Sequence, residues 1–171
     1  ENNPYLFDFY QDMPRWSFNL QIYFLNSRFS QIIKIQQGIK TVIQDRTIYE
    51  DAFIFAPNLH AMGLMSTRDF DNYQQLFKSV NSLIKPPDLL IYLRTSIPTL
   101  VNHIQKRGRE YEDSLRLDYL KRLNERYEAW ISSYKEGNLL VIDVDKCNFA
   151  EKKDQLGDVV NKVTAQLHGL F

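Results

Sequence analysis

Asp45, Arg46 and Thr47 follow the apolar residues Thr41–Ile43 after a single glutamine, so an acid and a guanidinium stand where a buried strand is expected to end and a helix to begin. The carboxyl ends of parallel strands are where open α/β sheets bind their ligands. An arginine at such a place can hold a phosphate, or fix a carboxylate, with its planar fork. A charged pair at a strand end can also be a solvated turn or a helix cap, and the triplet alone leaves both interpretations open.

Two polar side chains share one face of a predicted helix. Gln21 and Arg28 lie two turns apart, so both can face the same cleft. An amide carries a donor and an acceptor side by side, which suits the hydrogen-bonding edge of a nucleobase. A guanidinium held by an acid such as Asp51 suits such an edge equally well. Gln21 taken alone can also be an ordinary polar residue of an amphipathic helix.

Basic side chains gather at the end of another predicted helix, namely His103, Lys106, Arg107 and Arg109. Cations are favoured at helix C-termini, so compensation of the helix dipole is one explanation for the cluster. Arg107 and Arg109, however, flank Gly108. Two guanidiniums on either side of a flexible glycine can swing onto a polyphosphate and neutralise the charge that develops during phosphoryl transfer.

Helices and strands alternate along the chain that must position these residues. Apolar spacing and end signals predict helices over Trp16–Gln37, Ile48–Leu59, Arg68–Ile84, Ser96–Arg107, Leu117–Tyr134 and Lys153–Leu167. Strands are predicted at Thr41–Gln44, Leu89–Leu93 and Leu139–Asp143. The Leu89–Leu93 run is apolar enough for a strand covered on both faces. The alternation predicts one α/β domain over residues 1–171, with a doubly wound parallel sheet and surrounding helices.

Composition narrows the classes of partner. The 171 residues include 21 basic and 21 acidic ones, so no overall field attracts nucleic acid or an anionic membrane. A single cysteine, Cys147, excludes an internal disulfide and fits a reducing cytoplasm. No signal peptide and no bilayer-spanning apolar run is present. We therefore expect a soluble cytoplasmic protein without a nucleic-acid or membrane partner.

Several common catalytic and metal-binding patterns are missing. The histidines His60, His103 and His168 have no spacing with a cysteine or acid that indicates zinc, so no metal is assigned to protein ligands alone. The sequence contains neither the G-x-x-x-x-G-K-[ST] phosphate loop nor the G-x-S-x-G nucleophile pattern.

A series of motifs runs in order along nearly the whole chain: Tyr10, Pro14–Phe18, Gln21, Arg28, Asp45–Asp51, Ile91–Arg94, Lys106–Arg109 and Glu112. The series resembles the deoxynucleoside kinases, a family that includes deoxycytidine, deoxyguanosine and deoxyadenosine kinases, and it looks closest to bacterial members. The resemblance implies transfer of the γ-phosphoryl group of ATP to the 5′-hydroxyl of a deoxynucleoside in nucleotide salvage. It further implies a P-loop kinase-like fold and Mg²⁺ as the metal that accompanies ATP.

The resemblance also implies roles for residues at matching positions. Gln21 would read the base edge, with Arg28 and Asp51 as a charged pair beside it. The walls of the base pocket would be Leu6, Leu20 and Phe55, and the sugar 3′-hydroxyl would be held by Tyr10 and Glu112. Arg46 would lie near the 5′-hydroxyl and help to position the catalytic carboxylate.

On the ATP side, the resemblance implies that Arg107 and Arg109 belong to a lid, at about residues 106–114, which closes over the phosphates. Asp145 and Phe149 would lie beside the adenine. The chain departs from the family at His103, where many relatives have the first lid arginine, and Lys106 would have to compensate there.

The family's phosphate-binding loop and general-base glutamate precede the point where this sequence begins. By this alignment Glu1 falls after that glutamate, so it is not assigned the role. We therefore expect a fold without its first strand and phosphate loop, and a polypeptide that is inactive in this form. The natural protein is expected to be longer, with most Mg²⁺ contacts in its N-terminal segment.

Alternatives remain at this point. Relatives that prefer thymidine usually have smaller or apolar groups in place of Arg28 and Asp51, so the resemblance implies deoxyadenosine, deoxyguanosine or deoxycytidine as the substrate. A nucleoside monophosphate kinase shares the lid, and a non-catalytic nucleoside-binding module would need no phosphate loop. Members of the family are commonly dimers, so a homodimer is expected, with the apolar face of Trp16–Gln37 as its interface.

Overall fold

The structure is a computed structural model that describes residues 3–108 and 117–169. The chain divides into two compact units. The first unit comprises Glu1–Lys85 and Glu125–Trp130, and the second comprises Pro86–Asn124 and Ile131–Phe171. All residues that are expected to bind the deoxynucleoside, except Glu112, belong to the first unit, and the residues expected on the ATP side belong to the second.

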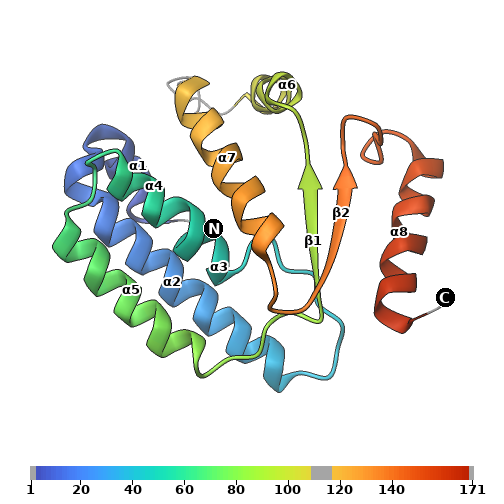
Figure 1. Cartoon of the computed structure of the whole chain (residues 1–171), viewed down its shortest axis with the longest axis horizontal. Coiled ribbons are helices and arrows are strands. Elements are labelled where there is room, and N and C mark those ends of the chain that lie inside the picture. Colours follow the sequence, from blue (N-terminus) through green and yellow to red (C-terminus); the bar gives the residue numbers. More distant parts are fainter. Residues whose placement is uncertain (1–2, 109–116, 170–171) are drawn as a thin grey trace. The chain divides into compact units, whose positions relative to one another are not determined.

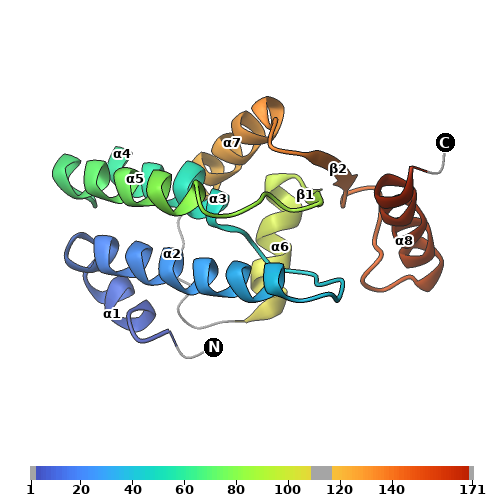
Figure 2. The same ribbon diagram turned by 90° about the horizontal axis from the view of Figure 1, so that it is seen from below.

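The described part of the first unit is helical. Its elements are α1 (Leu6–Gln11), α2 (Met13–Gln37), α3 (Ile48–Glu50), the π-helix η1 (Asp51–Phe55), α4 (Ala56–Ala61) and α5 (Thr67–Asn81), with part of α7 (Leu117–Ser133). Helices α2 and α5 lie side by side (Figure 1), and α1 with α2 forms one layer while α4 with α5 forms another (Figure 2). The core between them contains Leu20, Leu25, Ile48, Ala52, Leu59, Tyr73 and Phe77.

Helix α2 is bounded by clear local signals. The Asp12 carboxylate caps its first turn, and Pro14 lies within that turn, where its missing N–H leaves no partner unsatisfied. The helix therefore begins at Met13 rather than at the predicted Trp16. It ends before Gly38 as predicted. Its face toward the core carries Gln21 as well as leucines, which brings a polar amide into the interior.

The second unit contains a parallel sheet. Its elements are β1 (Leu89–Arg94), α6 (Ile97–Arg107), β2 (Asn138–Asp143), α8 (Lys153–His168) and the two ends of α7. The strands pair in parallel, with Leu89 opposite Asn138 and Arg94 opposite Asp143, and they point the same way in Figure 1. The predicted α/β class with a parallel sheet and surrounding helices is confirmed.

Helix α6 begins and ends as its sequence predicts. Ser96 is its N-cap residue and Pro98 lies in the first turn. Gly108 ends the helix in the left-handed conformation, with φ of 62°. A glycine adopts this conformation without the steric penalty that a Cβ brings, so it allows the chain to turn sharply after Arg107.

The strand predicted at Thr41–Gln44 is wrong. These residues form an irregular loop, and the side chains of Val42 and Ile43 are exposed by 49% and 94%. Among the described residues the sheet has two strands, β1 and β2, and neither pairs with this loop. A strand requires the backbone groups of a neighbour, which an apolar run cannot supply by itself.

The expectation that Leu89–Leu93 is covered on both faces is also wrong. Leu90 of β1 and Ile142 of β2 are buried, whereas Ile91, Leu93 and Val141 are exposed. The exposed side chains of β1 alternate with a buried one, because successive side chains of a strand point to opposite faces. By the register of the pair, Leu90 and Ile142 lie on opposite faces, and each face also carries an exposed apolar side chain, so neither face is covered throughout.

No helix among the described residues is long and apolar enough to cross a bilayer. The longest, α2, has 25 residues, but polar and charged side chains recur along its length.

Candidate functional site

Arg46 occupies an unusual backbone conformation. Its φ is 64°, and it is the one residue other than glycine with positive φ among the described residues. For a residue with a Cβ this conformation costs on the order of 1–3 kcal/mol, and such strain is found mostly where the surroundings hold it in place at functional sites. The predicted junction at Asp45–Thr47 is therefore a strained turn that leads directly into α3.

The residues after Arg46 form a capping box. The backbone N–H of Thr47 donates to Oε2 of Glu50 at 2.8 Å, and the Thr47 hydroxyl donates to the same oxygen. The Thr47 Oγ1 accepts in turn from the N–H of Tyr49 at 3.1 Å. Thr47 and Glu50 are both buried. The signal for this arrangement, threonine followed by glutamate at the third position, was readable in the sequence but Glu50 was not predicted as a site residue.

A π-helical turn follows at once. The N–H of Ala56 donates to the carbonyl of Asp51, five residues back, instead of the usual four. Pro57 provides the cause, since a proline has no N–H for the carbonyl of Phe53 and so removes one α-helical bond. Turns of this kind widen a helix locally and occur often at functional sites. This one contains both Asp51 and Phe55. The prediction of a helix from Ile48 is confirmed, but the π-helical turn within it was not predicted.

Arg28 joins α2 to this segment. Its Nε donates to Oδ2 of Asp51 at 2.6 Å, which confirms that the two charges form a pair. Its Nη1 donates to the backbone carbonyls of Asp45 and Arg46 at 3.3 and 3.4 Å. Only 13% of the Arg28 side chain and 2% of the Asp51 side chain are exposed. One guanidinium thus contacts both the acid and the strained turn.

Burial dominates the electrostatics of Asp51. It raises the pKa of the carboxyl from the ordinary 3.8 to about 6, and the charge and hydrogen bond of Arg28 oppose this rise without cancelling it. Burial likewise raises the pKa of Tyr73 far above its usual range, and the charge of Asp51 adds to the effect. The Tyr73 hydroxyl is buried and has no hydrogen-bond partner among the described residues. Asp51 and Arg28 therefore lie in a largely water-free environment.

The raised pKa gives Asp51 an unusual effect on stability. Between about pH 4 and pH 6 the folded protein binds a proton at Asp51 that the unfolded chain does not. This bound proton stabilises the folded protein. The stabilisation is fully present below that range and is lost as the pH rises through about 6. We expect the free energy of unfolding of the wild type, measured relative to Asp51→Asn, to increase as the pH is lowered across this range. Urea unfolding of both proteins at a series of pH values tests this, and a difference that stays constant or decreases contradicts it.

Gln21 is a buried amide with an unsatisfied oxygen. Its side chain is 3% exposed, and Oε1 has no hydrogen-bond partner among the described residues. An unsatisfied polar atom of this kind costs about 1–3 kcal/mol of stability. Gln21 and Arg28 lie on one face of α2, as predicted from their spacing. The amide is thus placed to accept a hydrogen bond from a ligand that reaches this face.

Aromatic and apolar side chains surround these polar groups. Phe55 lies under the guanidinium of Arg46, 5.1 Å from ring centroid to Cζ, and meets the Tyr127 ring edge-on at 6.4 Å. Leu20 belongs to the buried core, and Leu6 is partly buried against that core. Tyr10 is also partly buried and meets the ring of Phe9 edge-on. Tyr127, whose pKa burial raises to about 12, was not predicted as a neighbour of the site.

In the second unit, the Asp145 carboxylate caps the start of α6. Oδ1 accepts from the Thr95 hydroxyl and Oδ2 from the Ser96 N–H, both at 2.9 Å. The side chain of Thr99 contributes most to a pKa for Asp145 of about 2, well below the usual range. The Asp145 carboxylate, which was predicted to lie beside adenine, is therefore occupied by hydrogen bonds that link the segment after β2 to the segment after β1. Phe149, in the loop that follows, is half-buried.

The end of α6 is tied to the same loop. Lys106 donates to Oε1 of Glu151 at 2.5 Å, and Asn148 Nδ2 donates to its other oxygen at 2.9 Å. Arg107 occupies the last turn of α6. Arg109, Glu112 and most of the predicted lid lie outside the described residues.

Metal ligands are scarce in the described structure. No group of three or more histidine, cysteine, aspartate or glutamate side chains within residues 3–108 and 117–169 could hold a metal ion. A metal that enters with a nucleotide needs few protein ligands, because phosphate oxygens and water complete its shell.

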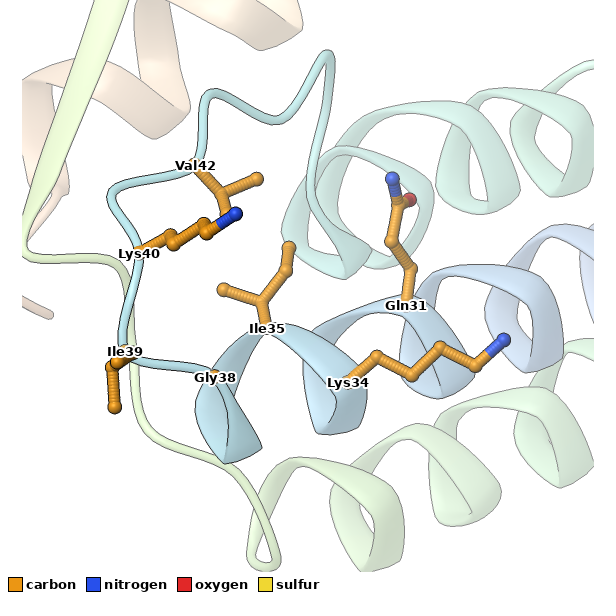
Figure 3. A pocket seen from close by; sticks show the side chains of 7 residues that line it. All are labelled: Gln31, Lys34, Ile35, Gly38, Ile39, Lys40 and Val42. Atoms are coloured by element: carbon orange, nitrogen blue, oxygen red, sulfur yellow. The ribbon is translucent and has the colours of Figure 1, made fainter.

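An open pocket of about 400 Å³ lies at the end of α2 and in the loop that follows. Figure 3 shows Ile35 of α2 and Val42 of the loop pointing toward the same hollow. The lining residues are Gln31, Lys34, Ile35, Gly38, Ile39, Lys40 and Val42. None of the predicted site residues is among them, so this pocket is separate from the groups around Arg28.

Comparisons with known proteins agree with the sequence motifs. The family model described as deoxynucleoside kinase matches residues 1–168. The deoxyadenosine/deoxycytidine kinase of Bacillus subtilis is 36% identical over 171 residues, which cover 98% of this chain and 78% of the relative. The deoxyguanosine kinase of Lactobacillus johnsonii is 36% identical over 176 residues, with the same two coverages of 98% and 78%.

Solved structures show the same architecture. The deoxyadenosine kinase from M. mycoides with bound dATP has a TM-score of 0.80 and 28% identity, over 95% of this chain and 82% of that one. The same kinase with bound dCTP has a TM-score of 0.79 and 28% identity, over 96% of this chain and 81% of that one. The similarity thus covers both units of the chain.

Proposed function

The chain belongs to the deoxynucleoside kinase family, and from this premise we propose that Gln21, Arg28 and Asp51 form the part of its site that recognises the base. It is an ATP-dependent enzyme that transfers the γ-phosphoryl group to the 5′-hydroxyl of a deoxynucleoside. The same comparisons favour this activity over a nucleoside monophosphate kinase or a non-catalytic binding module.

One observation carries the proposal. Gln21, with its unsatisfied buried amide oxygen, and Arg28 lie on one face of α2, and Arg28 forms a buried ion pair with Asp51 of η1. Arg28 uses Nε and Nη1 for the protein, and no acceptor among the described residues meets its Nη2. The two N–H groups of Nη2 can therefore donate to acceptors on a base edge. The acceptor Oε1 of Gln21 complements them, so the site offers donors and acceptors together.

We propose deoxyadenosine, deoxyguanosine and deoxycytidine as the class of acceptor substrate. Adenine and cytosine carry an exocyclic amine that can donate to an acceptor such as Asp51 or Gln21, and guanine carries acceptors that suit Arg28. Thymine presents a carbonyl and a methyl group at the corresponding edge and cannot donate there. The names of the curated relatives from B. subtilis and L. johnsonii support this class.

Gln21→Leu tests the base-reading role. Without substrate, the change removes an unsatisfied buried oxygen, so we expect an unfolding free energy equal to or higher than that of the wild type. With substrate, it removes a hydrogen bond to the base, and in the full-length enzyme KM for the deoxynucleoside should rise by about tenfold or more. Thermal unfolding and steady-state kinetics measure the two effects.

Gln31→Leu is a suitable control, because this glutamine is exposed on the same helix. It should leave KM for the deoxynucleoside within about twofold of the wild type. An unchanged KM for Gln21→Leu would remove Gln21 from the base site.

The family resemblance supplies the roles that we propose for the remaining residues of the deoxynucleoside site. Leu6, Leu20 and Phe55 wall the base, Tyr10 and Glu112 hold the sugar 3′-hydroxyl, and Arg46 acts near the 5′-hydroxyl. The contact between Arg46 and Phe55 supports this assignment, because it links the guanidinium to a wall of the proposed base pocket.

ATP is the phosphoryl donor, and we propose that Arg107 and Arg109 contact its phosphates while Asp145 and Phe149 shape the loop beside its adenine. The bonds of Asp145 to Thr95 and Ser96 support a shaping role rather than direct contact with the nucleotide. Mg²⁺, when bound, would neutralise phosphate charge during transfer, and we propose that phosphate oxygens of ATP are among its ligands.

A further inference from the structure

The peptide group between Arg46 and Thr47 is held at both of its polar ends by charged side chains. Its carbonyl, that of Arg46, accepts from Nη1 of Arg28 at 3.4 Å. Its N–H, that of Thr47, donates to Oε2 of Glu50 at 2.8 Å. In regular structure both groups would bond to other backbone groups, but here a guanidinium and a carboxylate take their place.

Two peptide groups together set the conformation of Arg46. Its φ lies beside the peptide group between Asp45 and Arg46, and its ψ lies beside the one between Arg46 and Thr47. The carbonyls of both groups accept from Nη1 of Arg28, and Glu50 holds the N–H of the second. The strained conformation of Arg46, with φ of 64°, is defined by both torsions, so a restraint on either peptide plane is a restraint on the arginine.

Glu50 is well suited to this task. Glu50 is buried, and its Oε2 atom accepts from both the N–H and the hydroxyl of Thr47. Bonds to an ionised acceptor are shorter and stronger than bonds between neutral groups. The Thr47 hydroxyl also accepts from Tyr49, which fixes the threonine rotamer and hence the geometry of the whole box.

We propose that Glu50 is a positioning residue for Arg46: through Thr47 it holds the strained turn that directs the guanidinium toward the reacting 5′-oxygen. The inference rests on the proposed catalytic role of Arg46.

Arg28 holds the carbonyl end of the same peptide group, but it also belongs to the proposed base site. Of the two side chains that hold this peptide group, Glu50 is therefore the one that can be changed without disturbing base recognition.

An ordinary capping role is the competing explanation, and the chain offers a matched control. Ser66 caps α5 through an N–H from Asp69 at 3.1 Å, in the same unit but at the start of another helix. Ser66→Ala removes a cap without touching the Arg46 turn. Loss of either cap lowers stability, so stability alone cannot separate the two roles.

The experiment, made in the full-length enzyme, compares Glu50→Ala, Glu50→Gln and Ser66→Ala, with Glu50→Ala also made in an Arg46→Ala background. We expect Glu50→Ala to lower kcat by about tenfold with little change in the Kd of the deoxynucleoside, because a misdirected group slows the reaction without weakening binding. Glu50→Gln, which retains an acceptor for the Thr47 N–H, should recover most of the loss. Ser66→Ala should keep kcat within about twofold of the wild type.

The double variant decides whether Glu50 acts through Arg46. We expect Arg46→Ala/Glu50→Ala to turn over at the rate of Arg46→Ala, since the guanidinium to be positioned is already gone. The inference is overturned if Glu50→Ala leaves kcat unchanged, or if it lowers kcat by the same factor in both backgrounds. If Arg46→Ala itself turns over normally, the catalytic assignment of Arg46 fails first, and this inference with it.

Discussion

Arg46→Ala in the full-length enzyme is expected to lower kcat by about 100-fold or more while KM for the deoxynucleoside stays within about threefold. Phosphoryl transfer depends on positioning and on stabilising the charge that develops on the transferring group, and an arginine supplies both. The guanidinium is held over Phe55 by a cation–π contact at 5.1 Å, so it is oriented before substrate arrives. Steady-state kinetics with ATP and each deoxynucleoside measure the effect.

Arg46→Gly is the control for this prediction. An alanine at φ of 64° is strained, whereas a glycine is not, so the glycine variant should be the more stable of the two. Both variants lack the guanidinium and should lose turnover equally. Recovery of kcat in Arg46→Gly would mean that backbone strain, and not the missing side chain, slows Arg46→Ala.

Asp51→Ala is expected to lower the free energy of unfolding by about 3 kcal/mol, because it leaves the charge of Arg28 in a buried position without its partner. The double variant Arg28→Met/Asp51→Ala removes both charges and should recover most of this loss. It also removes the polar groups that disfavour thymine, so thymidine turnover should rise relative to that of deoxyadenosine.

Urea unfolding measures the first effect, and turnover of each deoxynucleoside measures the second. A double variant as unstable as Asp51→Ala would show that the pair is not the source of the loss. Equal turnover of thymidine and deoxyadenosine by the wild type would contradict the proposed class of substrate.

The elements whose signals are local could be predicted from the sequence. Helix α6 lies between Ser96 and Gly108 as expected, because a cap residue, an early proline and a terminal glycine each act on their own turn. The strand at Leu89–Leu93 was also predicted, because a short apolar run that lies between prolines is typical of a buried strand.

Features that depend on a distant partner could not be predicted from local sequence patterns. Thr41–Gln44 has the composition of a strand, but pairing is a property of two segments, and the local pattern does not contain the second one. The pairing of Arg28 with Asp51 came from the family resemblance, because the two residues are far apart in sequence and no periodicity connects them. The role of Asp145 as the cap of α6 depends on the register of β1 and β2, which the sequence leaves open.

The two bonds from Nη1 of Arg28 to the carbonyls of Asp45 and Arg46 have a consequence for how such an enzyme can evolve. A lineage that changes its base preference by replacing Arg28 also removes a support of Arg46, the proposed catalytic arginine. Selection on substrate range therefore acts on catalytic rate at the same time. We therefore expect a change of base preference at Arg28 to be accompanied by a second substitution that restores support for the backbone at Asp45 and Arg46.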